Sequence, residues 1–531
     1  MKPRIVNLKQ SLLAVLSGLL LTAAFPRTNM AWLAWVALVP LMFAVSRASA
    51  REGFRMGMLA GLAHYLTLMY WLVIVMNTYG GLPKMLCAPI LFLFSTYLAI
   101  YPALFAAAFA FVAARPVACL LLPPAVWAAL EYLRAFMLSG FPWELLGYSQ
   151  YRQLKLIQIA DITGTYGISF VIVLTNVVVF LTLAALPRMH KPETAPSKKL
   201  RLAAAGLLVL LLALFLGYGQ WRLARIDRMS AEAPAKTISV LQGNIDQSIK
   251  WDPGNQVATL KKYFRLSEKV LAQKPDLIIW PETAAPFYFG NNPRLTRMVQ
   301  QNVAKLGVHQ LIGFPLVAQH SDRLSFYNSA YLLNPDGTVA GRYDKAHLVP
   351  FGEYVPFKKW LPFLGKIVEQ VGDFQSGNPG ATISWETEQL GILICYELIF
   401  ADLSRAQAQN RATLLVSITN DAWYGHSSAP YQHFSMAVLR AVETRRTLVR
   451  AANTGISGFI GPGGRILNAT ALFKNATVTR SVPMMSAKSL YVHMGDGFAA
   501  ACLALSAIYF LLAALSSLKH RARAPKPSQK R

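Results

Sequence analysis

Long apolar segments are the feature of this chain that most restricts its fold. A helix that crosses a bilayer needs about 20 apolar residues, with a range of roughly 17–25. Eight segments approach, meet or exceed this length, and they cover residues 11–25, 30–46, 56–76, 85–114, 117–132, 166–186, 202–218 and 498–518. The mean hydropathy of +0.37 is too high for an ordinary soluble protein. We therefore predict an α-helical transmembrane bundle of about eight helices.

The distribution of basic residues orients these predicted helices. A formal net charge of +27 first suggests a nucleic-acid-binding protein. The basic residues lie in short segments between apolar ones, however, and such residues collect on the cytoplasmic side of membrane proteins. With eight spans, one side receives Arg47, Arg51, Arg55, Arg115, Arg188, Lys191, Lys198, Lys199, Arg201 and the basic tail. The other side receives little more than Arg27 and Lys84. We expect both termini in the cytoplasm and no nucleic-acid partner.

One large domain is inserted before the last predicted helix. We divide the chain into a transmembrane domain over 1–220, an inserted domain over 221–495, a final helix over 496–518 and a basic tail over 519–531. A transporter would show similar hydropathy, but it would not need this insertion. Strands are predicted at 237–241, 277–280, 311–314, 330–333, 391–395, 414–418 and 455–460, and helices at 257–273, 293–306, 403–408 and 432–444. This alternation predicts an α/β domain of stacked sheets covered by helices.

The connection over residues 131–164 lies on the same side of the membrane as the inserted domain. Its Trp and Tyr residues are typical of the aromatic belt at a membrane interface. We expect an anchoring loop there. A second hypothesis is that this connection lines a route by which lipid reaches the inserted domain.

Three chemically useful residues lie at predicted strand ends or in a loop of the inserted domain. Cys395 ends an apolar strand, and a strand end is a rigid platform for a nucleophile. Alone it would more often be a small buried hydrophobic residue. Glu282 ends a second apolar strand, and Lys345 lies in an aromatic-rich loop. Together they can form one catalytic constellation.

The motifs around these residues resemble a known superfamily. They are Trp-Pro-Glu at 280–282, Lys-x-x-Leu-Val-Pro-Phe-Gly-Glu at 345–353 and Cys-Tyr-Glu at 395–397. They are similar to the nitrilase, or carbon–nitrogen hydrolase, superfamily, whose Glu–Lys–Cys triad lies on an αββα sandwich. With the membrane segments, the chain resembles the apolipoprotein N-acyltransferase family over nearly its whole length. This resemblance implies a multi-pass protein of the bacterial inner (plasma) membrane with a periplasmic catalytic domain.

The resemblance also implies a role for each candidate residue. Cys395 would be the nucleophile, and since an ordinary thiol is only a few per cent ionised at neutral pH it needs a base. Glu282 would be that base, and Lys345 would stabilise the oxyanion. The supporting residues would be Glu353, Glu397 and Tyr396, and the substrate-binding residues Trp251 and Trp360. Asn420 and Asp421 are interpreted as turn residues.

The implied reaction is a two-step acyl transfer without a cofactor. A membrane phospholipid would donate an acyl chain to Cys395, and the α-amine of a diacylglyceryl-modified apolipoprotein would accept it. His347, His426 and His433 lack metal-ligand spacing, so we expect no metal site. One alternative is a membrane-tethered amidase or nitrilase that uses the same triad with water. Another is a transporter or scaffold whose inserted domain is inactive.

Two aromatic segments near the predicted site suggest mobile lids. Residues 350–374 mix aromatic side chains with lysines, and residues 286–289 form a second aromatic cluster. Such mixtures suit a membrane interface with anionic headgroups, although ordinary loop packing is the alternative. We expect that deleting the tip at 360–364 would impair activity on bilayer substrate.

Overall fold

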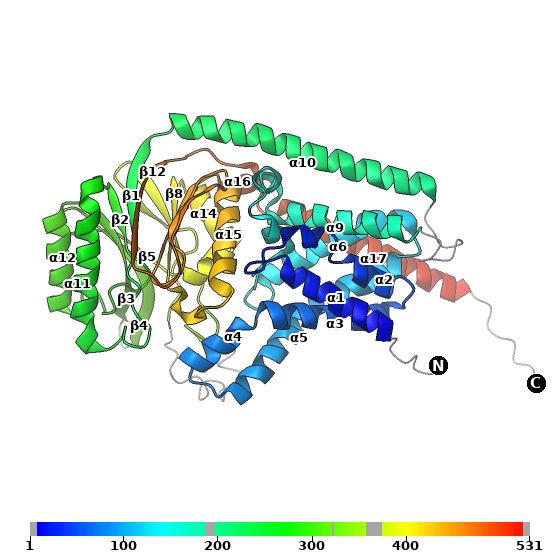
Figure 1. Cartoon of the computed structure of the whole chain (residues 1–531), viewed down its shortest axis with the longest axis horizontal. Coiled ribbons are helices and arrows are strands. Elements are labelled where there is room, and N and C mark those ends of the chain that lie inside the picture. Colours follow the sequence, from blue (N-terminus) through cyan, green and yellow to red (C-terminus); the bar gives the residue numbers. More distant parts are fainter. Residues whose placement is uncertain (1–7, 186–196, 321–322, 357–373, 524–531) are drawn as a thin grey trace, which may run out of the picture.

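The structure is a computed structural model that describes residues 8–185, 197–320, 323–356 and 374–523. Two parts lie side by side in Figure 1, a bundle of apolar helices and an α/β sandwich. The helix α10 (Lys198–Glu232) runs along one edge of the molecule from the bundle to the first strand of the sandwich. With 35 residues it is about 50 Å long, which exceeds the ~30 Å hydrocarbon core of a bilayer.

The bundle contains long helices interrupted by short 3₁₀ or π turns. Its elements, besides α10, are α1 (Leu8–Ala23), η1 (Ala31–Trp35), α2 (Val39–Val45), α3 (Ala50–Leu68), α4 (Trp71–Ile74), η2 (Val75–Tyr79), α5 (Lys84–Val112), α6 (Pro116–Phe136), η3 (Leu146–Gln150), α7 (Leu154–Ile157), α8 (Ala160–Thr163), α9 (Thr165–Leu183) and α17 (Gly497–Arg523). Small residues bring α3 and α5 together, since a Cβ on Gly57 would lie only 2.5 Å from the Cα of Ala103. This close approach is typical of helices packed within membranes.

The prediction of eight spanning helices is not confirmed. Among the described residues, five helices are long and apolar enough to cross a membrane, and six if the bent pair Ala50–Leu68 and Trp71–Tyr79 forms one span. The bend between the members of this pair is 49°. The first two predicted spans correspond to the shorter apolar helices Leu8–Ala23 and Ala31–Val45. Sequence hydropathy located the apolar segments, but it did not show where breaks shorten the helices.

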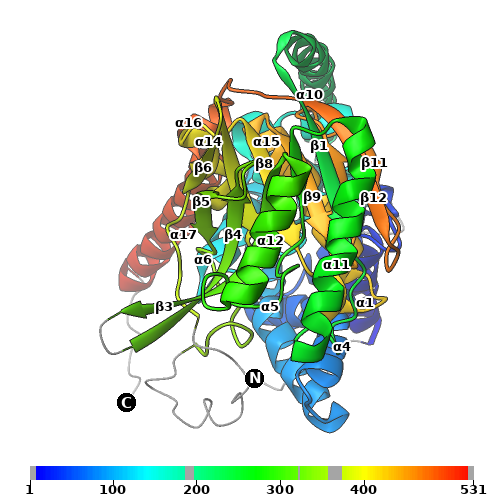
Figure 2. The ribbon, with the colours of Figure 1, turned by 90° about the vertical axis from the view of Figure 1, so that its left-hand side faces the viewer.

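The inserted part is a four-layer αββα sandwich (Figures 1 and 2). One sheet has the order β12-β1-β2-β3-β4-β5 and the other the order β11-β10-β9-β8-β7-β6. The strands are β1 (Ala235–Gln242), β2 (Leu277–Ile279), β3 (His309–His320), β4 (Arg323–Leu333), β5 (Val339–Asp344), β6 (Thr382–Trp385), β7 (Glu388–Ile394), β8 (Leu414–Thr419), β9 (Thr447–Ala452), β10 (Gly458–Ile460), β11 (Ile466–Ala469) and β12 (Ala476–Pro483).

Helices cover both outer faces of the sandwich. The outer layer holds α11 (Pro253–Val270) and α12 (Pro293–Leu306), which Figure 2 shows in front of the first sheet. The inner layer holds α14 (Ala401–Gln409) and α15 (Ala429–Thr444), which lie between the second sheet and the bundle in Figure 1. The shorter elements are η5 (Leu271–Gln273), η6 (Cys395–Ile399), η7 (Asp421–Tyr424) and α16 (Leu490–Met494). The bundle therefore contacts the sandwich through its inner helices.

Every strand and helix predicted in the sandwich has a counterpart, but five strands were missed. These are β5, β6, β9, β11 and β12. Four of them, β5, β6, β11 and β12, are the edge strands of the two sheets. Each has residues that are exposed or only partly buried, so their sequences lack a continuous apolar run. The fully buried β9 was missed because Arg450 interrupts its apolar pattern.

A single apolar core joins the bundle to the inner layer of the sandwich. It extends from residues such as Leu21 and Phe105 in the bundle to Phe400 and Leu439 in the sandwich. The connection over 131–164 takes part in this contact, since its Trp143, Tyr148 and Tyr151 are buried in the protein. The prediction that these aromatic residues form an interfacial belt is therefore wrong. Trp143 and Tyr148 instead contact α15: the Trp143 indole donates to Gln432 at 2.9 Å, and Arg440 donates to the Tyr148 hydroxyl at 2.7 Å.

Candidate active site

Cys395 lies in a strained turn at the end of β7. The strand before it is almost wholly buried, and Cys395 starts the 3₁₀ turn η6. Its φ of +53° lies in the left-handed region, which costs a non-glycine residue about 1–3 kcal/mol and is common at functional sites. The neighbouring strand β8 is parallel, with Ile418 opposite Ile394. The parallel register places Thr419 beside Cys395 at the same sheet edge.

Glu282 follows β2 and is held by two hydrogen bonds. The side-chain amide of Asn328 donates to Oε1 and the backbone N–H of Asn420 donates to Oε2, both at 2.8 Å. The chain at Glu282 can lie this close to β3 because Gly313 has no side chain. A Cβ on Gly313 would lie only 2.8 Å from the Cα of Glu282. The carboxylate is thus fixed, while each oxygen keeps a lone pair for a proton.

Lys345 follows β5 and is fully buried beside Glu353. Its Nζ lies 2.9 Å from both oxygens of Glu353. Asn328 also donates to Glu353 at 3.0 Å, so this amide bridges Glu353 and Glu282. Burial acts to lower the pKa of Lys345, but Glu353, Glu282 and Cys395 outweigh it and raise the pKa. Lys345 is therefore a stable cation, suited to hold a negatively charged oxygen.

The charges of these groups act on one another. Burial raises the pKa of the Cys395 thiol to about 12, Glu282 adds to the rise, and Lys345 opposes it. The thiol is therefore protonated at neutral pH and needs a base during attack. The structure thus brings together the three predicted catalytic residues in a buried site that contains both a carboxyl group and a cation.

Glu397 ties the Cys395 turn to the Lys345 loop. Its Oε2 accepts from the backbone N–H of Ile394 at 2.7 Å. Its Oε1 accepts from the N–H groups of Ala346 and His347 and from the hydroxyl of Tyr343, at 2.7, 3.1 and 2.9 Å. Burial raises the pKa of Glu397 to about 7. This side chain joins segments from two different sheets.

Tyr396 connects the turn to the bundle. Its hydroxyl donates to the carbonyl of Gly140 at 3.3 Å, and its ring contacts Phe400 and His347. The structure thus places this predicted supporting residue at the contact between sandwich and bundle.

The structure does not place either predicted substrate-binding residue against Cys395. Trp251 is exposed on the turn before α11, and its role stays a prediction. Trp360 lies outside the described residues, as does the proposed lid tip at 360–364. The aromatic cluster at 286–289 is not a lid, because Phe287 and Phe289 are buried in the outer layer against Phe314.

Three further residues contribute to the site and were not predicted to do so. Lys250 is buried, donates to the carbonyl of Glu282 at 3.2 Å, and interacts electrostatically with Cys395. Asn328 binds Glu282 through its side-chain amide. Asn420 precedes the turn η7, as interpreted from the sequence, and binds Glu282 through its backbone N–H. The sequence could have indicated Asn420, since it directly follows an apolar strand, and the predicted site residues Glu282 and Cys395 also lie at the ends of such strands. No sequence pattern marks Lys250 or Asn328, because only tertiary packing brings them to the site.

The two parts of the chain match two family models. Residues 17–178 match the apolipoprotein N-acyltransferase N-terminal domain, and residues 237–491 match carbon–nitrogen hydrolase. The αββα sandwich with its buried Glu, Lys and Cys is thus a carbon–nitrogen hydrolase domain, which is a cysteine-nucleophile enzyme fold. Among solved structures, an amidase from Nesterenkonia sp. AN1 is 20% identical with a TM-score of 0.38, covering 49% of this chain and 94% of that chain.

Full-length relatives define the family more narrowly. The apolipoprotein N-acyltransferase of Geobacter metallireducens is 47% identical, covering 94% of this chain and 95% of the relative. That of Methylococcus capsulatus is 33% identical, covering 98% and 100%. The chain belongs to the apolipoprotein N-acyltransferase family.

Proposed function

We propose that this protein transfers an acyl chain from a membrane phospholipid to the α-amine of a lipoprotein's diacylglyceryl-modified N-terminal cysteine. The observation that carries the proposal is the position of the Cys395 thiol. It is buried and interacts electrostatically with both Glu282 and Lys345, and the hydroxyl of the next residue, Tyr396, donates a hydrogen bond to Gly140 of the bundle. A nucleophile at this contact can meet substrates that reside in a bilayer.

In the first step Cys395 attacks the ester carbonyl of the phospholipid. Glu282 takes the thiol proton as the carbon–sulfur bond forms, and Lys345 stabilises the oxyanion. When the ester bond breaks, Glu282 returns the proton to the departing alcohol oxygen. The products are a Cys395 thioester and a lysophospholipid. Covalent catalysis divides a transfer between two bulky lipids into two easier steps.

In the second step the α-amine of the acceptor attacks the thioester. Glu282 takes a proton from the amine as the carbon–nitrogen bond forms, and Lys345 again stabilises the oxyanion. Cleavage of the carbon–sulfur bond releases the amide, and the proton on Glu282 returns to sulfur. The enzyme is thereby restored without any other reactant.

This function fits a bacterial inner membrane location. We propose that residues 1–220 and 496–518 form the transmembrane part, that residues 221–495 form a periplasmic catalytic domain, and that both termini and the tail at 519–531 are cytoplasmic. The apolar helices and the basic residues on one predicted side support this orientation.

Intact mass spectrometry tests the proposed function. After incubation of the purified protein with a diacyl phospholipid and no acceptor, we expect an added acyl mass that hydroxylamine removes and that Cys395→Ala lacks. Addition of a diacylglyceryl peptide should then discharge the adduct onto the peptide amine. An enzyme that forms no adduct but hydrolyses small amides would instead be a membrane-tethered amidase.

The pH dependence of this first step should report on Lys250. Burial lowers the pKa of Lys250 to about 8, against the opposing effect of Glu282 and Cys395. The side chain is therefore charged at neutral pH and loses its charge as the pH rises through 8. Because a nearby cation stabilises a thiolate, we expect thioester formation in the wild type to decline above this pH.

Two variants separate the charge of Lys250 from its bulk. We expect Lys250→Met to be about tenfold slower at neutral pH and to lack the decline, a change worth about one pKa unit of thiolate stabilisation. Lys250→Arg stays charged, so its rate should persist to higher pH. The measurement is the initial rate of thioester formation between about pH 6 and 10. A decline that persists in Lys250→Met would assign it to another group.

A further inference from the structure

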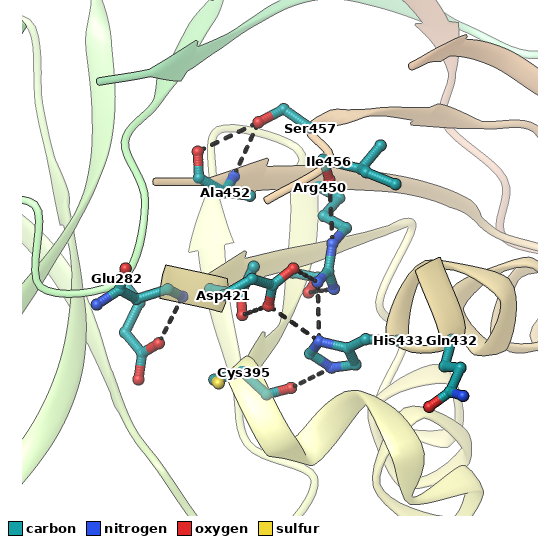
Figure 3. Close-up of polar contacts among 12 residues, drawn as sticks. Glu282, Cys395, Asp421, Gln432, His433, Arg450, Ala452, Ile456 and Ser457 are labelled. Carbon is teal, nitrogen blue, oxygen red and sulfur yellow. Dashed lines mark hydrogen bonds and ion pairs between the residues drawn. The ribbon is translucent and has the colours of Figure 1, made fainter. Parts of the chain in front are cut away.

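A fully buried polar network lies directly behind Cys395 (Figure 3). His433, on α15, places its Nε2 3.1 Å from the carbonyl oxygen of Cys395. Its Nδ1 lies 2.9 Å from an Nη2 of Arg450 and 3.1 Å from an oxygen of Asp421. Arg450 and Asp421 form an ion pair at 2.8 Å. This network has no part in the proton transfers described above.

The partners of His433 determine its tautomer. Nε2 faces a carbonyl oxygen, which only accepts, so Nε2 must carry the hydrogen. The guanidinium of Arg450 only donates, so Nδ1 accepts from it at 2.9 Å. The Asp421 oxygen near Nδ1 accepts instead from the Thr419 hydroxyl at 2.9 Å, and the other Asp421 oxygen accepts from Arg450 at 2.8 Å. Burial lowers the pKa of His433, and the charge of Arg450 lowers it further, whereas Asp421 opposes both effects. The net lowering keeps the ring neutral. Neutral His433 therefore donates one hydrogen bond to Cys395.

Residues of the bundle pack against His433 and its neighbour Gln432. The indole of Trp143 stacks on the His433 ring, with centroids 5.8 Å apart and planes 25° apart. The neighbouring Gln432 accepts hydrogen bonds from the indole N–H groups of Trp143 and Trp71, at 2.9 and 3.2 Å. It also donates to the carbonyl of Pro26 at 3.2 Å. Three separate segments of the bundle therefore meet at the start of α15.

We propose that His433 is a positioning residue for the nucleophile and that the bundle holds it in place through Gln432 and Trp143. The inference rests on the proposed function, since it assumes that Cys395 forms the thioester. Cys395 has a strained backbone, and a strained conformation persists only where its surroundings determine it. The His433 N–H and the packed Trp143 ring supply that constraint.

The same hydrogen bond orients a second group. The peptide unit between Cys395 and Tyr396 is planar and trans, so its N–H points opposite to its carbonyl. By holding the Cys395 carbonyl toward α15, His433 directs the Tyr396 N–H away from α15. A backbone N–H fixed beside a nucleophile stabilises the oxyanion that forms there. Loss of His433 should therefore slow the chemical step and leave lipid affinity unchanged.

Single-turnover thioester formation tests the role of His433. The probe is dipalmitoyl phosphatidylethanolamine in detergent micelles, and the readouts are the maximal rate and the half-saturating lipid concentration. His433→Leu removes the N–H donor at similar bulk, whereas His433→Gln retains an N–H. His426→Leu is the matched control, because His426 is an exposed histidine stacked on Phe473.

We expect His433→Leu to lower the maximal rate about 100-fold, as the loss of an oxyanion donor does. The half-saturating lipid concentration should stay unchanged. His433→Gln should recover about tenfold of this loss, and His426→Leu should match the wild type. A His433→Leu rate within about threefold of wild type would overturn the inference, as would equal losses in both His433 variants. A wild type that forms no thioester would instead contradict the proposed function, and the inference with it.

Trp143 tests the contribution of the bundle. 4-Nitrophenyl acetate is a small soluble ester that needs no lipid site, so its reaction with Cys395 reports on the nucleophile alone. We expect Trp143→Ala to slow both this reaction and the phospholipid reaction about tenfold, and Trp143→Phe, which keeps an aromatic ring, to slow them less. Cys395→Ala gives the background. If Trp143→Ala slowed only the phospholipid reaction, Trp143 would act on lipid access and the bundle would not position the nucleophile.

Discussion

Glu282→Gln should reduce the rate of thioester formation by about 10³–10⁴-fold at neutral pH. An amide cannot take the proton of Cys395, and burial holds the pKa of that thiol near 12. The variant must therefore rely on the very small fraction of thiolate that forms without a base. The substitution keeps the size of the side chain, so the loss reports on proton transfer.

The residual rate of this variant gives a second signature. Without Glu282 as base, the rate should follow the thiolate fraction and rise about tenfold per pH unit toward the pKa of Cys395. The measurement is single-turnover mass spectrometry between about pH 6 and 8, below the pKa of Lys250. Glu386→Gln is the matched control, since Glu386 is an exposed carboxylate paired with Lys236. A residual rate that is independent of pH would assign the base to another residue.

Two members of the proposed triad, Glu282 and Cys395, could be predicted because each lies at the end of a strand that the sequence marks clearly. Continuous apolar runs before Glu282 and Cys395 are local signals, and they remain visible without tertiary structure. Lys345 follows β5, which was not predicted, so it was identified through its motif alone. The structure places these segments at adjoining edges of two sheets, which no local pattern could show.

The groups that hold the triad are scattered along the chain and had no comparable signal. Asn328 lies inside β4, Lys250 lies in a turn, and Arg450 interrupts a buried strand. Each is an ordinary polar residue until packing removes water from around it, after which it must find a partner. No local pattern indicates the position of His433, because its Nε2 faces a backbone carbonyl of another segment.

The bundle was only partly predictable for a similar reason. Hydropathy measures the length of an apolar segment, and it identified the strongly apolar helices such as α9 and α17. It does not report the 49° bend after α3 or the turns that shorten the first helices. It also could not distinguish an aromatic residue at a membrane interface from one that packs on the sandwich, which is the position of Trp143.

Glu397→Ala should nearly abolish activity, although Glu397 has no part in proton transfer. The carboxylate accepts four hydrogen bonds in a fully buried position, from Tyr343, Ala346, His347 and Ile394. Alanine leaves all four donors without this partner, and each such buried group costs about 1–3 kcal/mol. Because these donors hold the Lys345 loop against the Cys395 turn, we expect both a lower unfolding temperature and a rate about 10²–10³-fold lower.

Glu397→Gln separates the loss of charge from the loss of the acceptor. The glutamine carbonyl can still accept from the Lys345 loop, but its NH₂ would face the Ile394 N–H, so we expect an intermediate loss of rate. The pH dependence of stability gives an independent check. Burial raises the pKa of Glu397 from 4.5 to about 7, so the folded state binds this proton more tightly than the unfolded state. The associated stabilisation is complete below pH 4.5 and is lost as the pH rises to 7.

Thermal unfolding of the detergent-solubilised protein across this pH window measures the effect. Relative to Glu397→Gln, whose amide does not titrate, the wild type should lose stability as the pH rises from 4.5 to 7. Glu388→Gln provides a second carboxylate-to-amide change in the same strand-and-turn segment. Parallel unfolding curves for wild type and Glu397→Gln would contradict a proton on Glu397, whereas full activity of Glu397→Ala would show that the Lys345 loop and the Cys395 turn stay in register without it.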